Sequence, residues 1–180
     1  MSVETPPSVI ALSGNPRPGS RTVSVAERLA ETLAREVLPG SAVATVDLAA
    51  VGPEVLAPEH PAADAALATL TAARLVVVAT PVYKASYTGL LKSFLDLLPA
   101  DGLLGVTAVP LVIAGSPGHA LAGEVHLRPL LVELGATVAT RSVVVTEPDL
   151  ADPAPVIDAW LATARPALRR AVGTTVEVVR

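Results

Sequence analysis

Short apolar runs alternate with amphipathic segments along most of this chain. The runs consist mainly of aliphatic and β-branched residues, without the regular polar alternation of a half-exposed strand; they cover residues 9–12, 42–46, 75–78, 106–114 and 137–145. Continuous apolar runs of this length are typical of strands that are buried on both faces. The pattern therefore predicts the five strands of a parallel sheet.

Helical periodicity separates these runs. Between the first two, apolar residues recur every three or four positions among charged ones, and Pro39-Gly40 ends the pattern. Further amphipathic segments predict helices over 64–73, 88–98, 119–134 and 153–171. Strands that alternate with helices imply right-handed crossovers. We therefore expect a flavodoxin-like, doubly wound α/β fold, with a five-stranded parallel sheet of order 2-1-3-4-5 and helices on both faces.

The length of the chain favours a single domain. It has 180 residues, of which 51% are hydrophobic, and this is enough for one core but too little for two comfortable domains. We expect the domain to cover residues 8–172. Residues 1–7 are predicted to form a flexible N-terminal arm, and residues 173–180 a C-terminal tail.

Two prolines interrupt these patterns. Pro110 lies inside the fourth apolar run, where proline favours an edge strand, a bulge or a later strand start. Pro129 lies well inside the fourth predicted helix, where it removes one donor and leaves the carbonyl of Val125 without its usual partner. The helix must kink or widen there, and a widened turn often marks a functional site.

Composition excludes several classes of function. Charged residues make up only 17% of the chain and the net charge is −4, so there is no electrostatic footprint for nucleic acid. The absence of cysteine excludes thiol nucleophiles and thiolate metal sites, and the three histidines lack metal-site spacing. No apolar run approaches the roughly 20 residues of a membrane span. We expect a cytoplasmic protein without a metal, nucleic acid or membrane partner.

The loop over residues 13–20 has the properties of an anion site. It joins a predicted strand to a helix, so that free backbone N–H groups and the positive end of a helix dipole meet there. Hydroxyl and guanidinium groups that suit a terminal phosphate dianion come from Ser13, Arg17, Ser20, Arg21 and Thr22.

Two other interpretations of this loop stay open. Its glycines and prolines could simply shape a tight turn that Ser20 caps. Ser24 and Glu27 also fit a capping box, which would start the helix later and weaken Thr22 as a ligand.

The loop over residues 81–88 holds two of the four aromatic rings in the chain, those of Tyr83 and Tyr87. Together with the loops over 13–20 and 115–118, it would emerge at the carboxyl edge of the sheet, where α/β proteins bind ligands. A loop with two rings in that place suggests a flat ligand.

These loops carry a family resemblance. Residues 12–22 (LSGNPRPGSRT) resemble the FMN phosphate loop of NADPH-dependent FMN reductases. Residues 80–99 (TPVYKASYTGLLKSFLDLLP) closely resemble the isoalloxazine loop and following helix of the subgroup that supplies reduced flavin to alkanesulfonate monooxygenases. Residues 115–119 (GSPGH) and 126–131 (HLRPLL) continue the match, and the resemblance spans roughly residues 8–147.

The resemblance implies an NAD(P)H-dependent FMN reductase, in which hydride passes from NADPH or NADH to N5 of FMN and reduced FMN serves a partner monooxygenase. FMN carries this chemistry, so we expect no catalytic side chain. The residues that it implies around the FMN phosphate are Ser13, Arg17, Ser20, Arg21 and Thr22. Those that it implies around the ring and the ribityl chain are Pro81, Val82, Tyr83, Lys84, Ser86 and Tyr87, with Gly115 and Ser116 on the far side.

The resemblance also bears on assembly. In the subgroup, the fourth helix carries an inserted residue, commonly Tyr, that forms a π-helix at a tetramer interface near the flavin. This chain has Val125-His126 there, so His126 is either a modulator in that role or an ordinary, partly buried histidine. We expect a homodimer or homotetramer built on the helices that start near Thr88 and His119, because residues 90–98 hold more apolar side chains than one sheet face needs.

Besides a non-enzymatic protein that binds a phosphoribosyl ligand, which would make the tyrosine loop coincidental, two alternatives remain at this stage. The first is a quinone, azo or metal-ion reductase that retains its FMN. The second is a flavodoxin-type electron carrier without an NAD(P)H site, which the modest net charge of −4 makes less favourable, since such carriers are strongly acidic. No feature identifies a site for a 2′-phosphate, so the choice between NADPH and NADH stays open.

Overall fold

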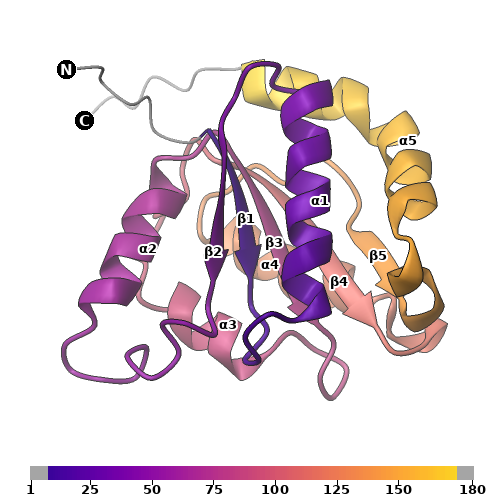
Figure 1. Ribbon diagram of the computed structural model, residues 1–180. Helices are drawn as coiled ribbons and strands as arrows, with labels where there is room; N and C mark the ends of the chain where they lie inside the picture. Colours follow the sequence, from indigo (N-terminus) through magenta and orange to yellow (C-terminus); the bar gives the residue numbers. More distant parts are fainter. Residues whose placement is uncertain (1–7, 174–180) are drawn as a thin grey trace.

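The computed structural model describes residues 8–173, and a five-stranded, wholly parallel sheet is its centre (Figure 1). The strands are β1 (Val9–Ser13), β2 (Val43–Asp47), β3 (Leu75–Pro81), β4 (Thr107–Ala114) and β5 (Val143–Thr146). Their order is β2-β1-β3-β4-β5, which confirms the predicted flavodoxin-like topology. The predicted arm over residues 1–7 and the tail beyond residue 173 lie outside the described residues.

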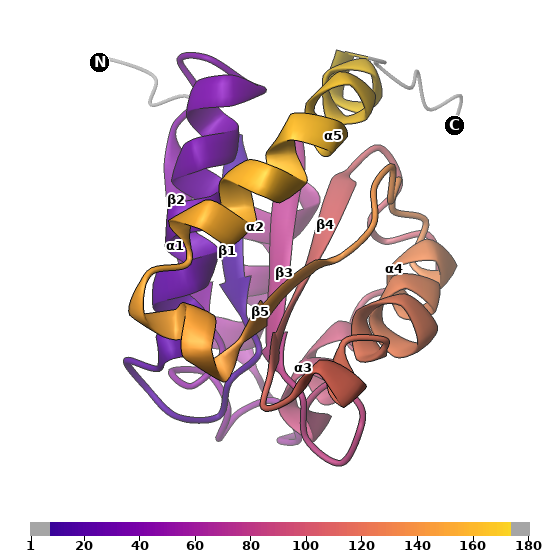
Figure 2. The same ribbon diagram turned by 90° about the vertical axis from the view of Figure 1, so that its right-hand side faces the viewer.

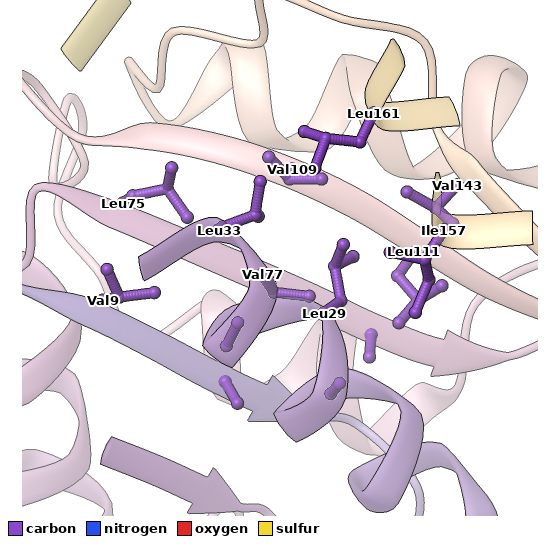
Figure 3. Packing of buried hydrophobic residues seen from close by; sticks show 14 of the residues in the cluster. Val9, Leu29, Leu33, Leu75, Val77, Val109, Leu111, Val143, Ile157 and Leu161 are labelled. Atoms are coloured by element: carbon purple, nitrogen blue, oxygen red, sulfur yellow. The ribbon is translucent and has the colours of Figure 1, made fainter. Parts of the chain in front are cut away.

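Helices cover both faces of the sheet (Figures 1 and 2). One face carries α1 (Arg21–Glu36) and α5 (Ala154–Gly173), and the other carries α2 (Pro61–Thr71), α3 (Gly89–Leu95) and α4 (Arg128–Glu133). Successive strand residues point to opposite faces: Val9 and Ala11 join the α1/α5 cluster, whereas Ile10 and Leu12 join the other. Figure 3 shows the α1/α5 cluster, in which Leu29, Leu33, Ile157 and Leu161 pack over the strands.

Pro110 lies in an interior strand, so the expectation of an edge, a bulge or a later start is wrong. β4 runs between β3 and β5 and begins at Thr107. On the β5 side, the N–H of Ala108 donates to Thr137, and continuous pairing begins only at Leu111. Pro110 lies between these two points, where β4 is not paired with β5. The missing N–H of this proline therefore removes no hydrogen bond from the sheet.

β5 is shorter than the predicted strand over 137–145, because helix side chains bond the first half of that segment. The guanidinium of Arg128 donates to the carbonyls of Val138 (2.8 Å) and Thr140, and the N–H of Ser142 donates to Glu124 (2.6 Å). Regular pairing with β4 starts only at Val143. Sequence periodicity carries no sign of such side-chain bonds.

The segment expected as one helix over 119–134 is divided into three parts. A 3₁₀ turn, η1 (Pro117–His119), is followed by the π-helix η2 (Gly123–Leu127) and then by α4. In the π-helix, the N–H of Arg128 reaches back five residues to the carbonyl of Gly123. The widened turn directly precedes Pro129, as the sequence predicts.

Residues 147–151 form a second 3₁₀ helix, η3 (Glu147–Ala151), between β5 and α5. No helix within residues 8–173 is both long enough and apolar enough to cross a membrane.

Candidate functional site

The carboxyl ends of the strands meet at one edge of the sheet, the lower edge in Figure 1, and the loops there enclose a cavity of about 460 Å³. Its walls come from the β1–α1 loop, the end of β3, the end of β4 and the residue after β5. The lining residues are Asn15, Arg17, Pro18, Gly19, Ser20, Arg21, Thr22, Pro81, Val82, Tyr83, Ile113, Gly115 and Glu147. The cavity is thus polar and cationic at the start of α1, and apolar beside β3 and β4.

Asn15 organises the first loop. Its Oδ1 accepts a hydrogen bond from the N–H of Arg17 (3.0 Å), and its Nδ2 donates to Oγ1 of Thr22 (3.0 Å). The first bond closes an Asx turn, and the second ties the loop to the first turn of α1. Asn15 therefore holds the backbone in the curve from which Arg17 and Ser20 face the cavity.

Ser20 caps α1, so the later start at Ser24 is wrong. The helix begins at Arg21, and the N–H of Val23 lies 3.4 Å from Oγ of Ser20. Residue 19 has φ +61°, a conformation that glycine adopts at little cost. Arg21 and Thr22, the first two residues of α1, line the cavity, so this end of the helix lies where an anion site requires it.

Ser13 and Thr22 are buried rather than freely exposed. Oγ of Ser13 lies 3.5 Å from the N–H of Asn15, and Ser13 does not line the cavity. Thr22 does line it, but its hydroxyl already accepts the bond from Asn15. Ser13 therefore only helps to hold the loop in shape, whereas Thr22 both holds the loop and lines the cavity.

The first two loops are joined to each other. Oγ1 of Thr88, the N-cap of α3, donates to the carbonyl of Gly14 (2.6 Å), and its N–H donates to Oγ1 of Thr80 (3.2 Å). A Cβ at residue 14 would lie 2.8 Å from Cβ of Leu91, so only glycine permits this approach. The position of the cationic end of the cavity therefore depends on the loop at its apolar end.

Residues 83–86 form a tight turn that projects from the second loop. The N–H of Tyr83 donates to the carbonyl of Ser86 (2.9 Å), and the reverse bond is 3.1 Å. The two central residues, Lys84 and Ala85, have φ values of 50° and 66°. Two positive φ angles are the pattern of a type I′ turn, which strongly prefers Asn-Gly, so this turn is strained.

A second, more open hollow of about 590 Å³ adjoins the cavity. Its walls are Val82, Tyr83, Lys84 and His119. Val82 and Tyr83 line both spaces, so the two meet at these residues. The hollow is mainly apolar, with the ammonium of Lys84 and the imidazole of His119 at its rim.

The structure brings together most of the residues that the sequence implicates, but not all. Those that line the cavity are Arg17, Ser20, Arg21, Thr22, Pro81, Val82, Tyr83 and Gly115. Lys84 lines the second hollow instead. Ser13, Ser86, Tyr87 and Ser116 line neither space; Tyr87 packs against the apolar cluster beside α3, and Ser116 precedes η1. His126 is exposed on η2 and lines neither space, so its role stays a prediction.

Sequence reasoning missed two important residues, Asn15 and Glu147. Asn15 could have been found from the Asn-Pro-Arg order, because asparagine commonly bonds a backbone N–H two residues later. Glu147 follows β5 directly, and a five-stranded parallel sheet places that point at the same edge as the other loops. In the structure, its Oε1 lies 2.5 Å from Nη2 of Arg21.

η3 fixes the backbone of Glu147. Oδ2 of Asp149 accepts hydrogen bonds from the N–H of Thr146 (2.9 Å) and from its hydroxyl (2.5 Å), which completes a capping box around Glu147. These two bonds, first that from the hydroxyl, lower the pKa of Asp149 below its ordinary value. The turn that holds Glu147 at the cavity is therefore closed by the ionised carboxylate of Asp149.

Fold and cavity together define a flavodoxin-like protein whose cavity at the carboxyl edge of the sheet is cationic at one end and apolar at the other. Residues 7–149 match the model of the NADPH-dependent FMN reductase family, so this chain belongs to that family of NAD(P)H-dependent oxidoreductases acting on FMN. An FMN reductase (NADPH) of Escherichia coli K12 is 41% identical over 133 residues, which cover 71% of this chain and 67% of that protein.

Two further comparisons agree with this assignment. The NADH-dependent FMN reductase SfnF of Pseudomonas fluorescens Pf0-1 is 34% identical over 150 residues, or 82% of this chain and 80% of that protein. The solved apo structure of an NADH:FMN oxidoreductase superposes with a TM-score of 0.71 at 30% identity, over 95% of this chain and 91% of that one.

Proposed function

We propose that this chain is an NAD(P)H-dependent FMN reductase that releases its reduced FMN to a partner monooxygenase in the cytoplasm. The observation that carries the proposal is the division of one cavity into a cationic end at the start of α1 and an apolar end beside Val82 and Tyr83. FMN has the same division, with a phosphate at one end and a ring system at the other.

The residues present fit FMN. Arg17, Arg21 and the hydroxyl of Ser20 stand at the open first turn of α1, where a phosphate dianion is stabilised by N–H groups and by the helix dipole. At about 460 Å³ the cavity falls in the usual range for cofactor sites. Bound FMN would supply the redox chemistry by accepting hydride at N5 from the nicotinamide.

We assign the second hollow to the pyridine nucleotide. It meets the cavity at Val82 and Tyr83, so a nicotinamide placed there would lie against the ring end of the flavin site. Lys84 at its rim can attract the anionic part of the nucleotide, and the ring of His119 can offer it a hydrogen bond. The names of the relatives include both NADPH-dependent and NADH-dependent enzymes, so the proposal covers both hydride donors.

The proposed release of FMN follows from exposure at the phosphate end. Arg17 and Arg21 are exposed, as are Pro18 and Gly19 between them. A ligand held mainly by exposed charges exchanges more readily than one that is buried. Names of relatives such as SfnF place them among the NADH-dependent FMN reductases, which supports the same role for this chain.

The test is the rate of NAD(P)H oxidation by flavin-free protein with and without added FMN. We expect negligible oxidation without FMN, and a rate that saturates as FMN is added. An acceptor behind a dialysis membrane should become reduced, because reduced FMN diffuses to it. Oxidation that requires a quinone or azo acceptor in contact with the protein, with FMN retained on gel filtration, would instead indicate a retained-FMN reductase.

A further inference from the structure

A carboxylate stands in the part of the cavity that is suited to an anion. Glu147 lines the cavity beside Arg17 and Arg21, and its Oε1 lies 2.5 Å from Nη2 of Arg21. The two side chains are 52% and 66% exposed, so this is a solvent-accessible ion pair that can open. A phosphate that enters the cavity therefore meets a guanidinium that already has an anionic partner.

The charges that line the cavity do not balance those of a phosphate monoester. Arg17 and Arg21 contribute two positive charges and Glu147 one negative charge, which leaves one net positive charge among the lining residues. A phosphate monoester carries about −1.5 to −2 at neutral pH. Without the carboxylate, the lining would carry two positive charges and would match the dianion.

The place of Glu147 is built into the fold. It is the first residue after β5, and the capping box of Thr146 and Asp149 holds the turn that presents it. Its neighbour Asp152 also faces an arginine of α1, since Oδ1 of Asp152 lies 4.0 Å from Nη2 of Arg28. Asp152 does not line the cavity, so the chain contains a matched acidic residue outside the site.

We propose that Glu147 sets the affinity for the flavin phosphate by competing with it for Arg21. When FMN binds, either Arg21 leaves Glu147, or the carboxylate stays within reach of the phosphate and repels it. Both outcomes weaken the binding of FMN and speed its release, while riboflavin, which lacks the phosphate, is unaffected. This inference rests on the proposed function, and it gives that function a means of exchanging FMN as a substrate.

The experiment measures dissociation constants for FMN and riboflavin by flavin fluorescence, in the wild type and in Glu147→Gln, Glu147→Lys and Asp152→Asn. Glu147→Gln keeps the size of the side chain and removes its charge, and we expect FMN to bind about five- to tenfold more tightly, with a matching decrease in its release rate. Glu147→Lys should tighten binding further. Riboflavin affinity should stay within about twofold in every variant, and Asp152→Asn should match the wild type.

Added salt should reduce the difference between wild type and Glu147→Gln, because screening weakens the repulsion. FMN affinity that is unchanged or weaker in both Glu147 variants would overturn the inference, as would an equal change for riboflavin. The proposed function fails separately, if the wild type neither binds FMN nor oxidises NAD(P)H with it. A wild type that reduces FMN, with Glu147 variants that bind it equally well, would refute this inference alone.

Discussion

The side chains of Asn15 and Thr88 hold the loops of this site in place. Asn15 closes the loop that follows β1, and Thr88 joins it to the loop that follows β3. Neither residue offers its side chain primarily to a ligand, since each has a structural partner in the described chain. The charged residues that line the cavity and the residues that hold its loops in place are therefore different.

The strained turn at Lys84 and Ala85 gives a prediction at this scale. Glycine adopts positive φ without the roughly 1–2 kcal/mol that an L-residue loses there, but it costs about 0.5–1 kcal/mol through its greater freedom in the unfolded chain. We expect Ala85→Gly to raise the free energy of unfolding by about 0.5–1 kcal/mol in chemical denaturation.

Ala65→Gly is the matched control for that substitution. Ala65 is exposed in α2, where φ is helical, so the same change should lower the free energy of unfolding by about 1 kcal/mol. Equal losses at both positions would show that the turn at residue 85 is not strained.

Among the elements, the π-helix η2 is held in place by an ionic clamp. Glu124 accepts hydrogen bonds from the N–H of Ser142 (2.6 Å) and from Nε of Arg128 (2.9 Å), while Arg128 also bonds the carbonyls of Val138 and Thr140. A Cβ at Gly123 would lie 2.7 Å from Cβ of Ser142, so the π-helix packs closely on the segment before β5. The hydrogen bonds of Glu124 and Arg128 thus both anchor the π-helix η2 and keep the first part of the segment before β5 from pairing with β4.

This clamp predicts a pH dependence of stability. Burial acts to raise the pKa of Glu124, but the hydrogen bonds from Ser142 and Arg128 together outweigh it, and the pKa lies below the ordinary 4.5. A carboxyl whose pKa is lower in the folded state stabilises the fold above its unfolded pKa, and that contribution is lost as the pH falls through the folded value. At neutral pH we expect Glu124→Gln to lower the free energy of unfolding by about 1–2 kcal/mol.

Urea denaturation at several pH values checks this expectation. The difference between wild type and Glu124→Gln should be full at pH 7 and should shrink below the ordinary pKa of 4.5. Glu133→Gln, at an exposed position of α4, should leave stability nearly unchanged. A difference that is constant over the whole pH range would mean that the charge of Glu124 does not stabilise the clamp.

The elements differ in how far the sequence could predict them. Buried apolar runs and Pro129 predicted the sheet order and the widened turn, because these depend on local pattern and on the missing N–H of proline. The length of β5 could not be predicted, since it depends on Arg128 bonding carbonyls ten and twelve residues away. The expectation for Pro110 was wrong for a similar reason: an interior strand accepts a proline only where the neighbouring strand does not pair with it, and β5 begins to pair with β4 at Leu111.

At the scale of the whole molecule, apolar side chains remain exposed along the segment that carries η2 and α4. Leu121, Val125 and Val132 are 67%, 58% and 54% exposed. They lie on the outer side of a segment whose inner residues, Leu127 and Leu131, are buried. This surface supports the part of the predicted homodimer or homotetramer interface that lies near His119. It does not support the part near Thr88, because the large apolar side chains of residues 90–98 are buried or half-buried against the core.

Sedimentation tests this prediction. We expect the wild type to sediment as a dimer or tetramer at micromolar concentration, and Leu121→Asp to shift it towards the monomer, because a charge in an apolar interface is costly. Leu56→Asp, at an exposed loop position outside that segment, is the control and should leave the assembly intact. A wild type that is monomeric with FMN present would contradict the prediction.

The site as a whole was partly predictable. The two loops after β1 and β3 could be recognised because a parallel sheet brings strand ends to one edge, and because arginine, serine and tyrosine have evident roles there. Glu147 was not assigned, since β5 was expected to end at residue 145 and the loop after it received no role, although the parallel topology places that loop at the same edge. The structural roles of Ser13 and Thr22 could be seen only from their hydrogen bonds, since Oγ of Ser13 accepts from the backbone N–H of Asn15 and Oγ1 of Thr22 accepts from Nδ2 of Asn15.

The comparison of FMN with riboflavin tests whether this cavity is a flavin phosphate site. We predict that the wild type binds FMN at least about tenfold more tightly, because charge-assisted hydrogen bonds contribute about 1.5–3 kcal/mol each. An Arg17→Ala, Ser20→Ala double variant should lose most of this preference while its riboflavin affinity stays the same. Equal dissociation constants for the two flavins in the wild type, or a double variant with unchanged FMN affinity, would contradict the assignment.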